Sequence, residues 1–508
     1  MNINLNTIKK IHFIGIGGIG LSAIARFMKE EGKEVSGSDL SLSLVTEKLE
    51  KLGIKIQIGQ SEKNISQDID LIIYTTAIPK NNSELRKAKE LGIKMITYPE
   101  SLGLIFNNKF GIAVCGTHGK SSVSAMAGLL LDDAKLDPSI IVGSILPRYK
   151  SNLRVGKGEY FIAEACEYER SFLSLYPRII ILNNIELDHT DYYKDIDDMK
   201  SAFEEFVSHL PENGTLIING DSPEISNFQF PISSEFPISN FKILKFGLKK
   251  NNDIQARDVE FKDGETKFKV IYNVPTLLGG AKGGNKDLDE FVLKVPGLFN
   301  VYNALGVIAL GLTLEVPADV IKKSLANYLG IWRRFEIKGE YKNALVVSDY
   351  AHHPTAVKAT IEATKQFYPG KRIFVVFQPH QHNRTKELYK DFLSSFNDAD
   401  TVILSEVFDV RGREETDDQN ISSLDLVNDI KKWQSNRWLH SPDRAVEPIV
   451  QKGSTVPKRL WNQHSGSIFY AKDLKEARKL IDENIKFDDI LLIMGAGDIY
   501  KVADDLVK

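Results

Sequence analysis

This sequence has few cysteines, a net charge close to zero and almost no long apolar segments. Each of these features excludes a class of protein. Only Cys115 and Cys166 occur among 508 residues, too few for a disulfide framework, so we expect a reducing compartment, the cytoplasm. The 65 Lys and Arg against 68 Asp and Glu leave a formal charge of -3, which excludes a general attraction to nucleic acid or anionic lipid. The apolar stretch IHFIGIGGIGLSAIA resembles a targeting signal, but it is rich in glycine and lacks a small-residue cleavage site. No other run approaches the ~20 residues of a membrane span, so we expect no membrane insertion.

The order of apolar segments along the chain indicates three α/β domains. A chain of 508 residues is too long for one hydrophobic core. Short apolar runs alternate with amphipathic stretches over about the first hundred residues, again from about residue 110, and again after about residue 341. This rhythm is typical of parallel sheets covered by helices. The region 225–300 instead predicts an antiparallel ribbon, and the stretch 434–466 interrupts the last region as a surface insertion.

The segment GTHGKSS, residues 116–122, predicts a phosphate-binding turn. It follows the apolar run FGIAVC and precedes a helical stretch, so backbone N–H groups and the positive end of the helix dipole would face an anion. Lys120 can reach phosphate oxygens, and the hydroxyl of Ser121 can bind Mg²⁺. Val114 stands where a P-loop has its first glycine, so the alternative is a plain strand-to-helix turn. We favour phosphate binding because the GK[ST] element follows a strand and opens a helix.

A second glycine turn, GIGGIG, lies a hundred residues earlier. Gly15, Gly17 and Gly20 satisfy G-x-G-x-x-G between a strand and a helix, and Asp39 follows where an acidic residue can meet a ribose hydroxyl. Taken alone, the motif suggests a nicotinamide or flavin enzyme, but the same turn serves any diphosphate. Two phosphate-binding turns on separate α/β units are better explained by two phosphorylated ligands.

Polar residues follow two strands of the second unit. Glu164 ends EYFIAE, while Asp188 and His189 follow RIIILNNIEL. Because ligands of open parallel sheets bind beyond the carboxyl ends of strands, Glu164 and His189 are expected near Ser121. Glu, His and a Ser hydroxyl could hold Mg²⁺ at phosphate oxygens, although His is unusual for that ion. The alternative is that they are capping or solvated loop residues.

Histidines gather in two motifs of the third unit, YAHHPT at residues 350–355 and FQPHQHNRT at residues 377–385. A zinc site is one reading, but no cysteine lies among them and the pairs lack helical metal-ligand spacing. We favour a polar pocket that holds a small anionic substrate together with Arg384.

Nine ordered segments resemble the Mur ligases over nearly the whole chain. They are IHFIGIGGIGLSAIA with SGSDL, GTHGKSS, EACEYERSFL, NNIELDH, PGLFNVYNALG, RRFE, DYAHHPT, FQPHQHNRT and MGAGDI. The resemblance implies three domains, each on a mainly parallel helix-covered sheet. These are a Rossmann-like UDP-sugar domain (1–107), a P-loop ATPase-like ATP domain (108–330) and a Rossmann-like amino-acid domain (331–508).

The motifs are most similar to those of family members that join L-alanine to UDP-N-acetylmuramate in peptidoglycan synthesis. The resemblance therefore implies ATP and Mg²⁺ as cofactors, with UDP-N-acetylmuramate and L-alanine as substrates, and an acyl phosphate as intermediate. The alternative within the family attaches a tripeptide to the same sugar. An NAD-dependent dehydrogenase would leave GTHGKSS, the histidines and the third domain without a task. A non-catalytic nucleotide-binding regulator is disfavoured by the intact catalytic positions.

The resemblance also assigns roles to single residues. Lys120, His189 and Arg334 would be catalytic, with Lys120 on the phosphates and Arg334 reaching the γ-phosphate. ATP would be bound by Gly116, Thr117, His118, Gly119, Lys120, Ser121, Ser122, Asn300, Asn303, Arg334 and Asp349. The UDP-sugar would be bound by Gly15, Gly17, Gly18, Gly20 and Asp39, the amino acid by His352 and Arg384, and the metal by Ser121, Glu164 and His189. Because Lys120 and Arg334 fall in different domains, we expect the domains to close about a hinge near residues 328–332.

Two single residues and one short segment depart from the family pattern. Ser121 stands where Thr is usual and supplies the same hydroxyl. EACEYERSF replaces EADESDASF, which places Cys166 and Tyr168 on the sugar-nucleotide side. Gln381 stands where many relatives carry Arg, so recognition of the amino acid would rest more heavily on Arg384.

Overall fold

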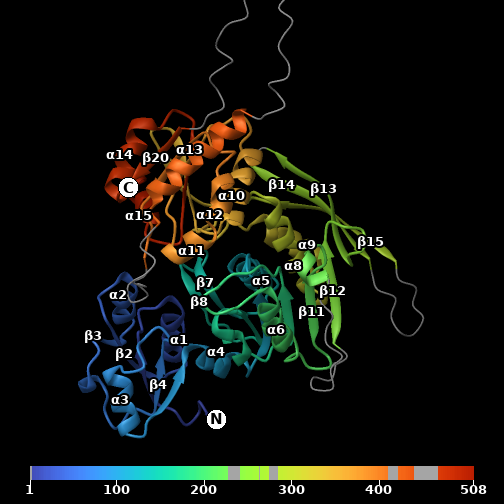
Figure 1. Ribbon diagram of the computed structural model, residues 1–508. Coiled ribbons are helices and arrows are strands. Elements are labelled where there is room, and N and C mark those ends of the chain that lie inside the picture. Colours follow the sequence, from blue (N-terminus) through green and yellow to red (C-terminus); the bar gives the residue numbers. More distant parts are fainter. Residues whose placement is uncertain (1–2, 227–240, 263, 274–283, 410–420, 440–466) are drawn as a thin grey trace, which may run out of the picture. The chain divides into compact units, whose positions relative to one another are not determined.

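The computed structural model describes residues 3–226, 241–262, 264–273, 284–409, 421–439 and 467–508. It contains three sheets, of five, ten and six strands, in which most neighbouring strands are parallel (Figure 1). This confirms the predicted α/β class. Among the described residues, no helix combines the length and apolar character that a membrane crossing requires.

The first sheet is parallel throughout and has the strand order β3-β2-β1-β4-β5. Its strands are β1 (Lys10–Ile14), β2 (Glu34–Asp39), β3 (Lys55–Ile58), β4 (Leu71–Tyr74) and β5 (Lys94–Thr97). The accompanying helices are α1 (Ile19–Glu30), α2 (Leu44–Lys51), the short η1 (Glu62–Asn64), α3 (Ser83–Glu90) and α4 (Tyr98–Phe106). The central strand β1 therefore ends at the first glycine turn, as the sequence predicted.

The second sheet has the order β15-β14-β13-β12-β11-β10-β6-β9-β7-β8. Its strands are β6 (Phe110–Cys115), β7 (Ser139–Leu146), β8 (Ser151–Arg154), β9 (Tyr160–Glu164), β10 (Ile179–Leu182), β11 (Thr215–Asn219), β12 (Lys242–Gly247), β13 (Ile254–Lys262), β14 (Glu265–Asn273) and β15 (Asn285–Leu293). Its helices are α5 (Lys120–Asp133), η2 (Tyr168–Ser174), α6 (Ile196–Val207), α7 (Pro223–Ser226), α8 (Leu298–Thr313) and α9 (Ala318–Ala326).

The prediction of an antiparallel ribbon over 225–300 was wrong at its start. Strand β12 pairs in parallel with both β11 and β13. Alternating polar and apolar residues report that one face of a sheet is exposed, and they do not report the direction of the neighbouring strand. Residues 227–240, 263 and 274–283 of that region lie outside the described residues.

The third sheet has the order β16-β17-β21-β18-β19-β20 and is parallel except for the β16–β17 pair. Its strands are β16 (Glu336–Tyr341), β17 (Ala344–Asp349), β18 (Ile373–Phe377), β19 (Thr401–Ser405), β20 (Ser467–Ala471) and β21 (Ile490–Met494). Its helices are α10 (Pro354–Phe367), α11 (His382–Glu387), α12 (Tyr389–Ser395), α13 (Ser423–Leu439), α14 (Leu474–Asn484) and α15 (Tyr500–Leu506). Helix α13 runs to Leu439 and includes the first residues of the predicted surface insertion (434–466), whereas residues 440–466 lie outside the described part, so the insertion stays a prediction.

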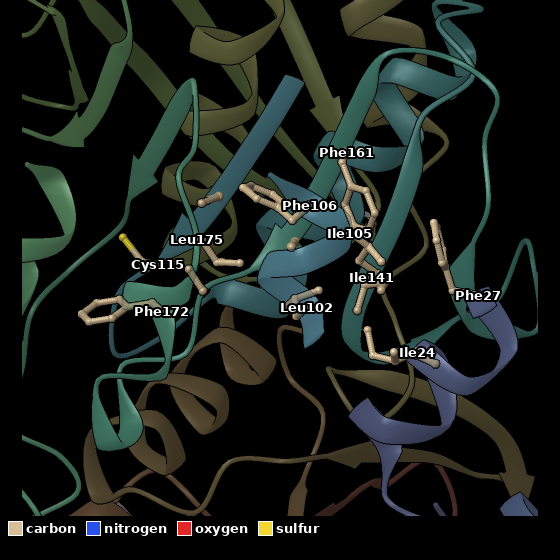
Figure 2. Close-up of a cluster of buried hydrophobic side chains, with 14 of the residues drawn as sticks. Ile24, Phe27, Leu102, Ile105, Phe106, Cys115, Ile141, Phe161, Phe172 and Leu175 are labelled. Carbon is tan, nitrogen blue, oxygen red and sulfur yellow. The ribbon is translucent and has the colours of Figure 1, made fainter. Parts of the chain in front are cut away.

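The chain forms two compact units. The first contains residues 1–259, 268–292 and 301–328, and the second contains residues 260–267, 293–300 and 329–508. Within the first unit, the first two sheets share one hydrophobic cluster, in which Phe27 of α1 and Phe106 of α4 both contact Phe161 of β9 (Figure 2). The ring centroids lie 6.0 and 5.6 Å apart. The boundary at residue 107 and the hinge near 328–332 stay predictions, although one unit ends at residue 328.

Candidate active site

The turn Gly116–Gly119 joins the buried strand β6 to helix α5, and its backbone requires glycine. Gly116 and Gly119 have φ angles of +124° and +83°, which side chains disfavour. A Cβ on Gly116 would lie 2.8 Å from the carbonyl oxygen of Asn184, and one on Gly119 would lie 2.6 Å from Oδ1 of Asn303. The turn therefore lies directly against the loop after β10 and against helix α8.

Hydrogen bonds from that loop fix the turn. The His118 N–H donates to Oδ1 of Asn184 at 2.8 Å, and the Thr117 hydroxyl donates to the carbonyl of Glu186 at 2.8 Å. The imidazole of His118 lies 3.4 Å from the Glu186 carboxylate. Ser121 and Ser122 are buried in the first turn of α5, so their hydroxyls lie at the N-terminus of the helix. These contacts hold the positive end of α5 at the edge of the sheet.

Lys120 is held by a carboxylate that sequence reasoning did not single out. Its ammonium donates to the carbonyls of Gly116 at 2.7 Å and Thr117 at 3.1 Å, and to Oε1 of Glu167 at 2.8 Å. The Glu167 side chain is only 1% exposed. Burial would raise the pKa of Glu167, but the charge of Lys120 and the bond to His189 outweigh it and hold that pKa below its usual value. Burial would lower the pKa of Lys120, and Glu167 reverses that shift.

The predicted metal residues end β9, open α5 and follow β10. Glu164 is the last residue of β9, where one oxygen accepts from the Gly143 N–H and the other, Oε1, is buried with no hydrogen-bond partner among the described residues. His189 lies in the loop after β10 in a left-handed conformation with φ +55°. Its Nε2 lies 3.5 Å from Oε1 of Glu167, and its ring packs 4.8 Å from that of Tyr168. The prediction that polar residues follow these strand ends is confirmed.

The first glycine turn is built differently. The Gly17 N–H donates to Oδ2 of Asp39 at 2.8 Å, and Oδ1 accepts from the Ser41 N–H at 3.3 Å. Gly15 has φ +82°, Gly18 caps α1, and a Cβ on Gly20 would lie 2.6 Å from the Tyr98 ring. Asp39 thus ties the turn to the end of β2, and each of its oxygens can still accept a further hydrogen bond.

Asn300 and Asn303 lie one turn apart on α8. The side chain of Asn300 donates to the carbonyl of Pro296 at 2.7 Å, while Asn303 faces the Gly119 turn. Both side chains are buried.

The second unit, which includes Asn300, also holds the remaining predicted residues. Asp349 ends β17 and accepts from the backbone N–H groups of Phe335 and Ala351, both at 2.7 Å. Burial raises the pKa of Asp349, against the opposing effect of Arg334. The guanidinium of Arg334 lies 5.0 Å from the centre of the Tyr350 ring, a cation–π contact. The neighbouring Arg333 is buried and packs over the same ring at 4.7 Å.

The histidine motifs meet within this unit. The rings of His352 and His380 lie 6.2 Å apart, and Arg384 lies in α11, which begins beside His380. His382 uses one ring nitrogen on the carbonyl of Ile421 at 2.8 Å and the other on Asp409 at 3.3 Å. Because both ring nitrogens of His382 have protein partners, His382 is not available as a zinc ligand in this structure. Gln381 precedes α11 with φ +65°, a conformation rare outside glycine.

Comparisons with known proteins cover nearly all of the chain. Family models match residues 10–110 (Mur ligase family, catalytic domain), 114–311 (Mur ligase middle domain) and 333–497 (Mur ligase, glutamate ligase domain). The UDP-N-acetylmuramate–L-alanine ligase of Sulfurihydrogenibium sp. is 37% identical over 99% of this chain and 98% of its own. The enzyme of the same name from Clostridium kluyveri is 39% identical over 98% of this chain and 97% of its own.

Solved structures agree. The crystal structure of UDP-N-acetylmuramate-alanine ligase from Thermotoga maritima superposes with a TM-score of 0.73 at 26% identity, covering 98% of both chains. A murein peptide ligase from Psychrobacter arcticus shares the fold with a TM-score of 0.66 at 22% identity, covering 98% of both chains.

Proposed function

The chain belongs to the Mur ligase family, and we propose that it joins L-alanine to UDP-N-acetylmuramate with conversion of ATP to ADP and phosphate. The observation that carries this proposal is the full-length similarity to relatives named for that reaction, at 37 to 39% identity, on a chain with Lys120 in its central glycine turn. The tripeptide-adding alternative is less supported, because the full-length relatives from Sulfurihydrogenibium sp. and Clostridium kluyveri are both named for the alanine reaction.

The chemistry requires an activated carboxylate. A carboxylate is a poor electrophile, so one of its oxygens must become part of a leaving group before an amine can attack. The lactyl carboxylate of the sugar attacks the γ-phosphorus of ATP, and ADP leaves. The amine of L-alanine then attacks the acyl phosphate through a tetrahedral intermediate, and phosphate departs with the former carboxylate oxygen. Phosphoryl transfer of this kind depends chiefly on positioning and on neutralisation of charge.

We assign the phosphates of ATP to the central turn. Lys120 and the N–H groups at the start of α5 would neutralise them, with Ser122 beside the turn, and Asn300 and Asn303 would contact adenine. Arg334 would contact the γ-phosphate, and Asp349 would contact the ribose.

Mg²⁺ fits the residues at the carboxyl ends of β6, β9 and β10. Oε1 of Glu164 is buried and has no hydrogen-bond partner among the described residues; a buried carboxylate oxygen left without a partner is costly, and it is the kind of ligand that Mg²⁺ prefers. Ser121, Glu164 and His189 would hold the metal, which when bound would neutralise phosphate oxygens.

We assign the UDP diphosphate to the turn of Gly15, Gly17, Gly18 and Gly20, with Asp39 at its side. The amino acid would lie in the second unit, with its carboxylate on His352 and Arg384. A cationic Arg384 is suited to a carboxylate because a guanidinium can donate two parallel hydrogen bonds.

An acceptor screen tests the proposal. Purified protein is incubated with ATP, magnesium and UDP-N-acetylmuramate, and phosphate release is followed with L-alanine, glycine, L-serine or the tripeptide as acceptor. We expect release only when both the sugar and L-alanine are present, with a product whose mass equals the sugar plus one alanine residue. Release with the tripeptide but not with L-alanine would refute the proposal in favour of the recycling reaction.

A further inference from the structure

The ammonium of Lys120 has no unused donor. A lysine ammonium offers three N–H donors, and Gly116, Thr117 and Glu167 supply three acceptors at 2.7, 3.1 and 2.8 Å. A phosphate oxygen that accepts from Lys120 must therefore replace or share one of them. The partner most able to keep the ammonium in place during that exchange is the charged one, Glu167, because charge-assisted hydrogen bonds are the stronger kind.

The same carboxylate oxygen also reaches His189. Oε1 of Glu167 lies 2.8 Å from Nζ of Lys120 and 3.5 Å from Nε2 of His189. Lys120 opens α5, whereas His189 lies in the loop after β10, so these two groups come from separate strand ends. One buried atom thus connects the residue proposed for phosphate with a residue proposed for the metal.

The backbone that carries Glu167 is constrained. The next turn places Glu169 (φ 50°, ψ 29°) and Arg170 (φ 53°, ψ 28°) in left-handed conformations, which are strained for residues other than glycine. The Arg170 N–H donates to the carbonyl of Glu167 at 2.9 Å, and the Tyr193 hydroxyl donates to that same carbonyl. The Arg170 guanidinium pairs with Glu205 at 2.8 Å and Asp198 at 3.1 Å. Strain of this kind persists where surrounding contacts fix it, and it gathers at functional sites.

We propose that Glu167 is a positioning residue of the ligase reaction, which fixes the Lys120 ammonium and the His189 ring relative to each other. It acts through these two groups. The inference rests on the proposed function only for the kinetic part of its test.

The kinetic test compares Glu167→Gln with Glu169→Gln, an exposed acid two residues away. Glu167→Gln keeps the shape and removes the charge, and we expect kcat to fall by about 100-fold, because misplacement by about 1 Å can cost that much. The KM for L-alanine should change by less than about threefold, because His352 and Arg384 lie in another unit. Glu167→Asp keeps the charge with a shorter reach and should recover part of the loss, whereas Glu169→Gln should match the wild type. A kcat of Glu167→Gln within about twofold of the wild type would overturn the proposal.

A binding test does not need ligase activity. The affinity for the fluorescent analogue N-methylanthraniloyl-ATP with magnesium is measured for wild type, Glu167→Gln, Lys120→Met and the double variant. If Glu167 acts through Lys120, the Glu167→Gln change weakens binding by at least about fivefold when Lys120 is present and by less than about twofold in the Lys120→Met background. An equal loss in both backgrounds, or no loss in either, would overturn the proposal. The double variant replaces a buried ion pair by neutral groups, so it should fold even if Glu167→Gln alone leaves Lys120 uncompensated.

The two proposals can fail separately. A wild-type protein that binds the analogue but makes no alanine product would refute the proposed function, and the binding cycle would still decide the role of Glu167.

Discussion

The chain contains two glycine turns that look alike in sequence and differ in charge. GIGGIG contains no cationic side chain, and the acidic side chain of Asp39 accepts a hydrogen bond from the Gly17 N–H at 2.8 Å. GTHGKSS contains Lys120, which is paired with the buried Glu167 at 2.8 Å. Both turns follow a buried strand and open a helix, so both present backbone N–H groups to an anion.

The difference in charge between the two turns suggests that one only binds a phosphorylated ligand, whereas the other takes part in phosphoryl transfer. Backbone N–H donors are sufficient to bind a diphosphate that does not react. Transfer of a phosphoryl group instead redistributes negative charge among the phosphate oxygens in the transition state, and a cationic side chain stabilises that charge. The first turn therefore suits a substrate that keeps its phosphates, and the second suits the nucleotide that loses one.

The largest expected effect comes from removing the charge of the second turn. Lys120→Met should lower the rate of phosphate release by roughly 10³-fold, since loss of one well-placed donor to a transition state costs about that much. The matched control is Lys157→Met, an exposed lysine of the same unit, which should behave like the wild type. A Lys120→Met enzyme with more than about a tenth of the normal rate would remove the proposed distinction between the turns.

Strand β1, which precedes the first glycine turn, contains a buried histidine that should make the stability of the protein sensitive to acid. His12 of β1 is buried, and burial alone lowers its pKa to about 4 from an ordinary 6.5. Below pH 6.5 His12 is protonated in the unfolded chain but stays neutral in the folded protein. Its contribution to the free energy of unfolding is therefore complete above pH 6.5 and is lost as the pH falls towards 4. The loss amounts to about 3 kcal/mol.

Urea unfolding at pH 7 and at pH 4.5 measures this loss, and His12→Gln should lose less stability than the wild type between the two. Equal losses in both proteins would show that His12 does not supply the pH dependence. Unfolding at pH 7 and pH 8 serves as the control, because His12 does not titrate between them.

Two glycine substitutions should separate the ligands of the turns. Gly119→Ala places a Cβ 2.6 Å from Asn303 at φ +83°, and Gly20→Ala places one 2.6 Å from Tyr98. We expect Gly119→Ala to raise the KM for ATP by about tenfold with little change for the sugar nucleotide, and Gly20→Ala to do the opposite. Each variant is the control for the other. A rise in both KM values for either variant would mean that the two turns do not serve separate ligands.

The smallest effect is expected at Asp39. Asp39→Asn keeps an oxygen that can accept from the Gly17 N–H, so if the residue mainly shapes the turn, the KM for the sugar nucleotide should rise by less than about threefold. An increase beyond about tenfold would instead indicate a direct charged contact with the ligand, as the sequence motif suggests.

Much of this architecture follows from the sequence because it is periodic. The apolar runs predict the strand KIHFI, the helix from residue 19 and the strand that ends at Glu164, while the glycine motif predicts the turn between the first strand and its helix. The pairing direction of β12 could not be predicted. Alternation of polar and apolar residues reports that one face of a strand is exposed, and it carries no information on the direction of the neighbouring strand.

Glu167 was missed for a different reason. Its place in EACEYER resembles a polar loop, and an acidic residue in a loop is ordinarily solvated. The turn after this buried carboxylate contains the left-handed residues Glu169 and Arg170, and such conformations in residues other than glycine leave no local signal in the sequence. Glu167 follows strand β9 and Lys120 follows strand β6. The two residues come close to each other only because β6 and β9 pair, with Val114 opposite Glu164.

The central claim, that the Lys120 turn energises the sugar carboxylate, is tested most directly by tracing that carboxylate's oxygen. UDP-N-acetylmuramate labelled with heavy oxygen in the lactyl carboxylate is turned over with ATP and L-alanine, and the released phosphate is analysed by mass spectrometry. We predict that the wild type transfers one labelled oxygen to each phosphate and that Lys120→Met yields no labelled phosphate above background. Unlabelled phosphate from the wild type would show that water rather than the carboxylate takes the phosphoryl group, and would contradict the account.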